Sequence, residues 1–466
     1  MKNQLISIKS IFLNQINIIK LYKQFILRQK KNKVDVSINY SCYFPNWGES
    51  YGDYILKILQ KKINIKDRFY YSLREIYNYY NHSDLQVFKN NYVDLKKYSN
   101  LVLSWGTDKD FDINGNFYDR YFNKYNLYNK NTLWIIIYQG KDLEFKNNVE
   151  NLIIVKKKRE FIINFLFFNL NNFLYFSVKS FFANKKTIFD FIKITKFDYK
   201  LKDLILKILK NNNFEKIIVP YEGQPFQNYI FNEIKKLNIK ILTIGYVHSS
   251  LSAFPSIYLK REGHPKKILI HGLNNKIILS NFLNWKKNDL YITESARFLI
   301  SKKKLFKNKI FLPYSINNPD FLIKKFEIFL KKSKDKSLPI FAIKNHPLMS
   351  YSLYHIKFIK SINKLILKNK KKFSYNNKNN LSICFGVTNS VIEALERKVN
   401  VLHIFYNPVF ESFNTLIWKD IKIEILDNNI YKYSLKKNGV YIKFGKKIKK
   451  ISTWLSQSLK KYESSV

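Results

Sequence analysis

The sequence predicts an α/β protein with two parallel sheets in separate domains. Short apolar runs alternate with helical segments in both halves of the chain, which is the pattern of strands joined by helical crossovers. The chain has 466 residues and a hydrophobic fraction of 46%, enough for two or three domains that each bury a core. Polar residues follow several apolar runs directly, and open α/β sheets bind their ligands at such strand ends.

Three segments are expected: an N-terminal helix at 1–33, a first domain at 34–285 and a second domain at 286–466. Residues 1–33 carry apolar side chains near helical spacing, with Lys and Arg between them, and the first acidic residue is Asp35. A basic amphipathic helix of this kind can lie on an anionic membrane surface or pack on its own domain. Its apolar run is too short for the core of a secretory signal.

The clearest strand–helix–strand unit covers residues 217–250. An apolar strand ends in a polar turn, a helix follows at about 225–237, and a second strand covers 239–246. Because a helical crossover returns the chain to a parallel neighbour, Glu222 and His248 should both leave their strands at the carboxyl edge of the sheet. A carboxylate and an imidazole at that edge form a candidate acid/base pair. The alternative is a surface glutamate beside a structurally bonded histidine.

The chain carries 82 basic and 34 acidic residues, a formal net charge of +48. Such a charge suggests nucleic acid or an anionic membrane as a partner. Lys, Asn, Ile, Phe and Tyr are all abundant and the basic residues are spread along the chain, so an AT-rich genome explains much of the lysine. The sequence has no RRM, KH, zinc-finger or helix-turn-helix signature, and we expect no specific nucleic-acid partner.

Cysteine, histidine and glycine exclude several kinds of site. Cys42 and Cys384 are far apart, which fits a reducing, cytoplasmic location and excludes a cysteine-based zinc site. The seven histidines include no HxxxH or HExxH spacing, and the twelve glycines form neither the GxGxxG fingerprint nor a Walker A loop. These absences leave no motif for a dinucleotide or a P-loop nucleotide, and we expect no cofactor.

Two stretches of the first domain have more than one interpretation: a possible metal site and a possible membrane span. Residues 108–122 begin like a calcium loop, but Tyr121 stands where that loop needs its bidentate glutamate, so metal binding is the weaker hypothesis. Residues 161–178 carry no charge, yet four asparagines argue against a membrane span. We expect a buried or acceptor-facing helix there, within an apolar insertion at 161–200. Further strands are expected at 34–40, 101–105, 133–138, 151–155, 267–271, 289–293 and 310–313.

The second domain has its own polar edge. The strands expected at 339–343 and 382–385 are followed by these residues: Lys344, His346, Thr388, Asn389, Ser390 and Glu393. Thr388 or Asn389 would cap the helix that follows and leave its first N–H groups for a phosphate. A lysine, a histidine and a helix N-terminus suit a phosphate leaving group in a cleft between the domains. The alternative is a solvated lysine, a His–Pro turn and an ordinary helix cap.

Several short motifs resemble those of a known group of enzymes. KNHP at 344–347 and GVTNSVIEAL at 386–395 look like the paired motifs of bacterial GT-B enzymes that use cytidine-nucleotide donors: capsule polysialyltransferases, Kdo transferases and CDP-glycerol glycerophosphotransferases. A longer pattern is similar to surface carbohydrate biosynthesis proteins. It consists of SWG at 104–106, YDRYF at 118–122, YEGQPFQ at 221–227, GYVHSS at 245–250, a segment at 265–272 and ESARF at 294–298.

The resemblance implies two Rossmann-like domains that face each other across a cleft. His346, Thr388 and Ser390 would hold the donor phosphate, with Glu393 near the ribose. The family commonly has Trp-Glu where this chain has Phe226-Gln227, so a carboxylate is missing here. The resemblance also assigns a set of residues to the acceptor side or the cleft: Trp105, Asp119, Arg120, Gln224, Ser249 and Arg297.

With this resemblance, the sequence predicts a glycosyltransferase of surface polysaccharide or lipopolysaccharide synthesis. The resemblance implies that the enzyme needs no bound metal. Its partners would be a nucleotide-sugar donor and a glycan or lipid-linked acceptor, with peripheral contact at the inner face of the plasma membrane. Glu222 would act as general base and His248 would orient substrate or assist proton transfer, while Lys344 and His346 stabilise the departing nucleotide. Three alternatives stay open: a polyol-phosphate transferase, a catalytically inactive relative and a basic nucleic-acid-binding protein.

Overall fold

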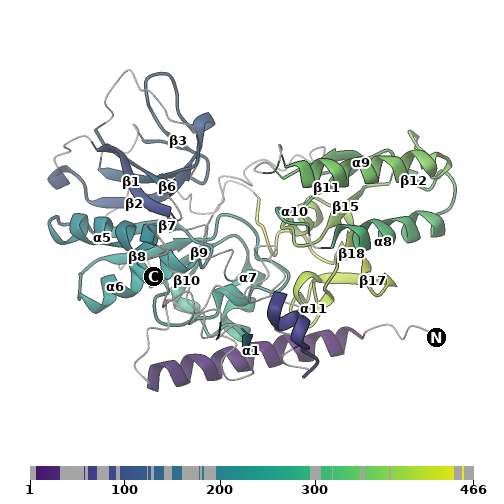
Figure 1. Ribbon diagram of the computed structural model, residues 1–466, viewed down its shortest axis with the longest axis horizontal. Coiled ribbons are helices and arrows are strands. Elements are labelled where there is room, and N and C mark those ends of the chain that lie inside the picture. The colour runs from purple at the N-terminus through teal and green to yellow at the C-terminus, as the bar shows by residue number, and fades with distance from the viewer. Residues whose placement is uncertain are drawn as a thin grey trace.

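The computed structural model describes residues 7–31, 57, 61–70, 83–90, 95–122, 124–126, 131–140, 150–159, 178, 181–182, 196–293, 306–316, 318–346, 349, 352–376, 379–444 and 454–455. Within these residues, two mainly parallel sheets of eight and six strands form an α/β protein, consistent with two Rossmann-like domains (Figure 1). The strand expected at 34–40, most of the insertion at 161–200 and Arg297 lie outside the described residues.

The first sheet has the strand order β1-β6-β5-β2-β7-β8-β9-β10. Its strands are β1 (Ser83–Asn90), β2 (Asn100–Gly106), β5 (Thr132–Tyr138), β6 (Leu152–Arg159), β7 (Lys216–Pro220), β8 (Leu242–Tyr246), β9 (Lys267–Ile270) and β10 (Leu290–Ile292). All neighbours are parallel except β1, which runs antiparallel to β6. The chain builds outward from β2 to β6 and then from β7 to β10. The strand order therefore reverses between β2 and β7, where open sheets bind ligands.

The first domain also contains three helices and several short elements within the described residues. They are α5 (Lys196–Lys210), α6 (Pro225–Lys236), α7 (Leu273–Phe282), the β3–β4 pair (Tyr118–Asp119 and Lys124–Tyr125) and the short 3-10 turns 95–97, 108–110, 256–258 and 287–289. The strands expected at 101–105, 133–138, 151–155 and 267–271 are confirmed, as is the helix of the central unit. β8 begins at Leu242, later than expected, because Asn238 takes a positive φ of 52° just after α6.

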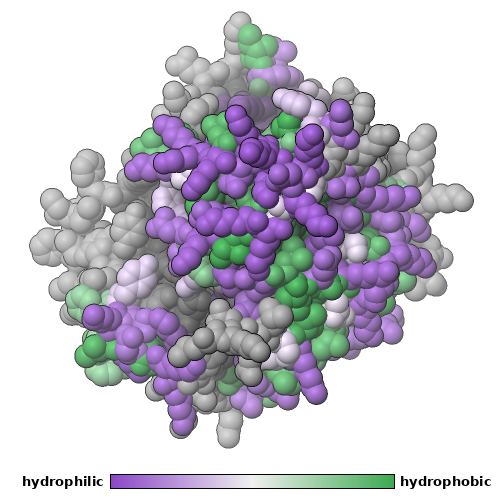
Figure 2. All heavy atoms as spheres, turned by 90° about the vertical axis from the view of Figure 1, so that its right-hand side faces the viewer, coloured by the Kyte–Doolittle hydropathy of each residue, from purple (hydrophilic) through white to green (hydrophobic). Residues whose placement is uncertain are grey.

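The second sheet has the order β13-β11-β15-β16-β18-β17. Its elements are β11 (Lys309–Phe311), α8 (Pro319–Lys332), β13 (Ala342–Lys344), α9 (Leu353–Lys368), β15 (Leu381–Phe385), α10 (Ser390–Glu396), β16 (Asn400–Ile404), α11 (Pro408–Glu411), β17 (Ile421–Asp427) and β18 (Ile430–Leu435). β17 and β18 form an antiparallel hairpin and the other strands are parallel. The strand expected at 339–343 is divided, since β12 (Leu338–Pro339) pairs with β14 (Phe373–Ser374) in a separate sheet. Hydrophilic residues predominate on the outer face of this domain (Figure 2).

Two segments of the range 286–466 pack on the first domain. β10 is the edge strand of the first sheet, because residues 290–292 pair in parallel with β9. Near the C-terminus, Trp454 and Leu455 are buried in the same apolar cluster as Trp134 of β5. Asn100 of β2 donates from Nδ2 to the Leu455 carbonyl at 3.1 Å. The chain therefore leaves the first domain after β10 and returns to it at its end.

The returning segment is held between the domains by Glu396 at the end of α10. The buried Glu396 carboxylate accepts hydrogen bonds from the backbone N–H groups of Gly439, Tyr441 and Ile442. On the other side, Asn275 of α7 donates from Nδ2 to the Tyr441 carbonyl at 2.9 Å. Residues 439–442 thus bridge an α10 carboxylate of the second domain and a helix of the first.

Helix α1 (Ile8–Lys31) also spans both domains and runs beneath them in Figure 1. The ring of Phe12 packs edge-on against Phe282 of α7, with centroids 6.3 Å apart. Buried Gln15 donates from Nε2 to the carbonyl of Val409 in α11 at 2.8 Å, and Asn414 donates to the Ile8 carbonyl at 2.9 Å. Ile11, Ile18 and Ile19 of α1 are therefore packed on protein, and these buried side chains cannot reach a bilayer. None of the helices in the described part of the chain is long and apolar enough to cross a membrane.

The packing of α1 can be tested at Ile18, which is fully buried in a cluster that includes residues of both domains. Ile18→Ala should lower the free energy of unfolding by about 2–5 kcal/mol because it opens a cavity. Leu13→Ala, on the exposed face of the same helix, is the matched control and should cost no more than about 0.5 kcal/mol. Chemical denaturation of the full chain measures both, and equally small effects would contradict the packing.

Candidate functional site at the carboxyl edge of the first sheet

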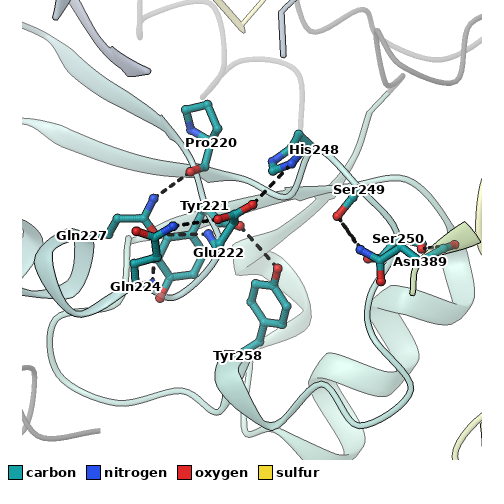
Figure 3. A network of polar contacts seen from close by, with 10 residues as sticks. All are labelled: Pro220, Tyr221, Glu222, Gln224, Gln227, His248, Ser249, Ser250, Tyr258 and Asn389. Atoms are coloured by element: carbon teal, nitrogen blue, oxygen red, sulfur yellow. Dashed lines mark hydrogen bonds and ion pairs between the residues drawn. The ribbon is translucent and has the colours of Figure 1, made fainter. Parts of the chain in front are cut away.

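Glu222 and His248 meet at the carboxyl edge of the first sheet. β7 and β8 are parallel, with Pro220 opposite Tyr246, so the residues that follow each strand leave the sheet at the same edge. His248 Nε2 lies 3.5 Å from Glu222 Oε1 (Figure 3). The Glu222 side chain is 32% exposed, whereas His248 is buried. The pair thus combines a carboxylate that a substrate can reach with an imidazole fixed behind it.

Gln227 holds the turn that carries Glu222. Its buried Oε1 accepts from the backbone N–H groups of Glu222 and Gln224, each at 3.1 Å, and its Nε2 donates to the Pro220 carbonyl at 2.8 Å. An amide can both accept and donate, and an ionised carboxylate at this position could not donate to Pro220. The turn therefore uses both the oxygen and the nitrogen of the Gln227 amide.

Two further residues of the turn fix the Glu222 carboxylate. Gln224 donates from Nε2 to Glu222 Oε2 at 2.7 Å, so one carboxylate oxygen is bound by Gln224 while the other faces His248 (Figure 3). Gly223 takes a φ of +69°, and a Cβ there would lie 2.7 Å from a side-chain carbon of Ile257. Glycine is thus needed for both its backbone angle and its lack of a side chain.

A row of aromatic rings borders the pair. Phe226 packs edge-on against Trp105 at 6.0 Å, Trp105 against Tyr121 at 5.9 Å, and Tyr121 against the His248 imidazole at 4.5 Å. Trp105 lies near the end of β2 and His248 follows β8, so the row crosses the point where the strand order reverses. Tyr121 was not predicted as a site residue, because its contact with His248 joins segments more than a hundred residues apart.

Asp119 and Arg120 support this row. Asp119 is completely buried and its Oδ1 accepts from the N–H groups of Tyr121 and Phe122, at 2.7 and 3.0 Å. Burial raises the pKa of the Asp119 carboxyl to about 7. Arg120 forms an ion pair with Asp110 and donates to Thr107 Oγ1 at 2.7 Å. Both residues therefore shape the loop that positions Tyr121.

The carboxylates in the stretch that partly matches a calcium loop accept hydrogen bonds from backbone N–H groups in or next to that stretch. Asp112 Oδ1 accepts from the N–H groups of Asn114 and Asn116, at 2.9 and 2.8 Å, and Asp110 Oδ2 accepts from Thr107 N at 2.8 Å. Within the residues that the structure describes, no group of three or more His, Cys, Asp or Glu residues could hold a metal ion.

Asn389 joins the edge of the second sheet to the edge of the first. Its Nδ2 donates to Ser249 Oγ at 3.0 Å, and Ser250 Oγ donates to the Asn389 carbonyl at 3.3 Å (Figure 3). A residue expected at the donor and one expected at the acceptor are thus bonded to each other. The residues directly after His248 therefore contact the start of α10.

Thr388 and Asn389 have different roles at the start of α10. Asn389 occupies the N-cap position, but its side chain makes no cap bond, because the amide is turned towards Ser249. Thr388 Oγ1 instead accepts from Ser390 N at 3.2 Å. Glu393 is buried in the first turn of α10. Burial raises the pKa of the Cys384 thiol, and the nearby Glu393 charge raises it further.

Lys344 and His346 follow β13. Lys344 is exposed at the strand end, and the half-buried His346 ring packs edge-on against Tyr314 with centroids 5.3 Å apart. The Asn345 side chain accepts from His346 N at 2.9 Å, which fixes the backbone there. β13 and β15 flank β11 on either side, so these residues and residues 386–390 leave the sheet at the same edge.

His403 of β16 was not predicted as a site residue and fixes the loop before α10. It is fully buried, and its Nε2 lies 2.7 Å from the carbonyl of Gly386, which takes a φ of +55°. The hydrogen bond requires the Nε2 proton. Burial lowers the pKa of His403 to about 4, so the ring is neutral near pH 7.

Comparison of the chain with family models and with curated proteins finds no match. The function is therefore argued from the residues of this chain.

Acid should destabilise the fold through His403. The unfolded histidine titrates near pH 6.5 and the folded one near 4, so the unfolded state binds the proton more tightly. Stability is fully present above pH 6.5 and falls as the pH drops towards 4, by about 3 kcal/mol for this group. Urea unfolding across this pH range measures the loss. His403→Gln should remove part of the slope, and an unchanged slope would contradict a buried neutral His403.

Proposed function

We propose that the chain is a glycosyltransferase of GT-B architecture. It transfers a sugar from a CMP-, CDP- or UDP-linked donor to a surface polysaccharide or lipopolysaccharide acceptor. The observation that carries this proposal is the Glu222 carboxylate, held by Gln224 and placed 3.5 Å from His248 where the strand order of the first sheet reverses. The short motifs of the chain support the proposal. The motifs at 221–227 and 245–250 lie at the carboxyl edge of the first sheet, and residues 344–346 and the motif at 386–395 lie at that of the second.

In the proposed reaction, Glu222 is the general base. An acceptor hydroxyl attacks the anomeric carbon of the donor sugar, Glu222 takes the hydroxyl proton, and the bond from that carbon to the phosphate oxygen breaks. A base for this step must be positioned and accessible, and Glu222 is partly exposed on a turn fixed by Gln227. His248 orients the carboxylate or assists the proton transfer. Trp105 and Tyr121 of the aromatic row, both half-buried, lie beside the pair and could contact a sugar ring.

The second domain would hold the donor. Lys344 and His346 supply positive or hydrogen-bonding groups at the end of β13, and Thr388 and Ser390 lie at the same edge of that sheet. Groups of this kind stabilise the negative charge that grows on a departing nucleotide, which removes the need for a metal ion in that step. The bond between Asn389 and Ser249 supports a transfer between substrates held by different sheets. A nucleotide-linked donor places the reaction in the cytoplasm.

The base role is tested with Glu222→Gln, which removes the proton acceptor and keeps the size of the side chain. Nucleotide release from a panel of CMP-, CDP- and UDP-sugars, in the presence of acceptor glycans, should fall by about 10²- to 10⁴-fold. Glu233→Gln is the matched control. Glu233 lies in α6, outside the turn, and its carboxylate forms an ion pair with Lys236 at 2.9 Å. This variant should leave the rate unchanged.

A loss below about tenfold for Glu222→Gln would remove this residue from the role of base. If a polyol phosphate rather than a sugar appears on the acceptor, the chain is a phosphotransferase and the glycosyltransferase proposal fails.

A further inference from the structure

Residues 65–70 form a short helix that turns apolar and aromatic side chains towards water. Ile65 and Phe69, spaced to share one helix face, are 71% and 60% exposed, and Lys66 and Tyr70 beside them are also exposed. Single exposed apolar residues are common on protein surfaces, but a group of them marks an interaction site.

Polar contacts hold this short helix in place. Asp67 pairs with Lys57 at 2.5 Å, and its N–H donates to Asn64 Oδ1 at 2.8 Å. Arg68 Nη1 donates to the Phe181 carbonyl at 2.6 Å, which ties the helix to a segment 113 residues further along the chain. The contact of Arg68 therefore places residues 181–182 beside this short helix.

The second segment adds exposed apolar side chains of its own. Phe182 is 64% exposed and Val178 is also exposed, one helical turn before it, with Phe182 N donating to the Val178 carbonyl at 3.0 Å. We name the combined surface the aromatic patch. It consists of Ile65, Phe69, Tyr70, Val178 and Phe182.

The charges around the aromatic patch favour an anionic partner. Lys61, Lys62 and Lys66 are all exposed, and the acid of this stretch, Asp67, is paired with Lys57. Phe and Tyr rings together with lysines are the combination that suits the boundary of a bilayer, where rings enter the apolar layer and ammonium groups meet anionic headgroups.

We propose that the aromatic patch docks on an anionic lipid bilayer surface. This role goes beyond sugar transfer and does not depend on it. It also assigns the membrane contact to residues other than Ile11, Ile18 and Ile19 of α1, which are buried in the protein. An acceptor carried by a lipid would then be presented to a chain that lies on the same surface.

The test is sedimentation of the full chain with phosphatidylcholine vesicles that contain or lack phosphatidylglycerol, at moderate salt. The variant Phe69→Ser with Phe182→Ser should bind the anionic vesicles at least about tenfold more weakly, because two rings no longer enter the bilayer. Lys62→Glu with Lys66→Glu should also weaken binding, by about fivefold for each lysine removed. The matched control is Leu353→Ser with Leu367→Ser, two exposed leucines of α9, and it should bind like the parent chain.

Three results would overturn the proposal. The first is that the parent chain does not bind anionic vesicles. The second is that the phenylalanine variant binds them as well as the parent, and the third is that the α9 control loses as much vesicle binding as the phenylalanine variant. A fourth is a change in molecular mass by light scattering for the phenylalanine variant with unchanged vesicle binding, since the patch would then join copies of the chain. All three double variants alter exposed side chains, so thermal unfolding should be unchanged and serves as the folding control.

Discussion

The candidate site depends on the bonds of Asn389 to Ser249 and Ser250. They join the carboxyl edges of the two sheets next to His248, where both sheets present their polar residues. Away from this edge, α1 and residues 439–442 tie the same two domains together, through Gln15 on one side and the Glu396 carboxylate on the other. The relative position of the two edges is thus fixed by polar contacts at several places.

Within the first sheet, one amide determines where the proposed base lies. Gln227 accepts two N–H groups and donates to the Pro220 carbonyl, so the turn after β7 has a single conformation in which Gln224 can hold the Glu222 carboxylate. In the second sheet, buried His403 plays a comparable part by fixing Gly386 before α10. The accessible polar residues at each edge therefore rest on buried partners that fix the backbone.

The sequence predicted the buried strands because parallel strands with covered faces carry continuous apolar runs, as β5 does. It missed β1, an edge strand whose Ser, Asp, Gln and Lys side chains break such a run. Parallel pairing also predicted that Glu222 and His248 would meet. The contacts of Tyr121 with His248 and of Asn389 with Ser249 could not be predicted, since they join segments far apart in sequence and depend on how loops and domains pack.

Thermal unfolding of the full chain with CMP, CDP, UDP, GDP or a short DNA, at low and high salt, tests most directly whether the edge of the second sheet holds a nucleotide. A ligand at about a hundredfold its dissociation constant should add about 2.7 kcal/mol of stability. We expect one pyrimidine nucleotide to raise the melting temperature at both salt concentrations, and His346→Ala to abolish the shift. Stabilisation by a short DNA alone, and only at low salt, would contradict a nucleotide site and with it the proposed transfer.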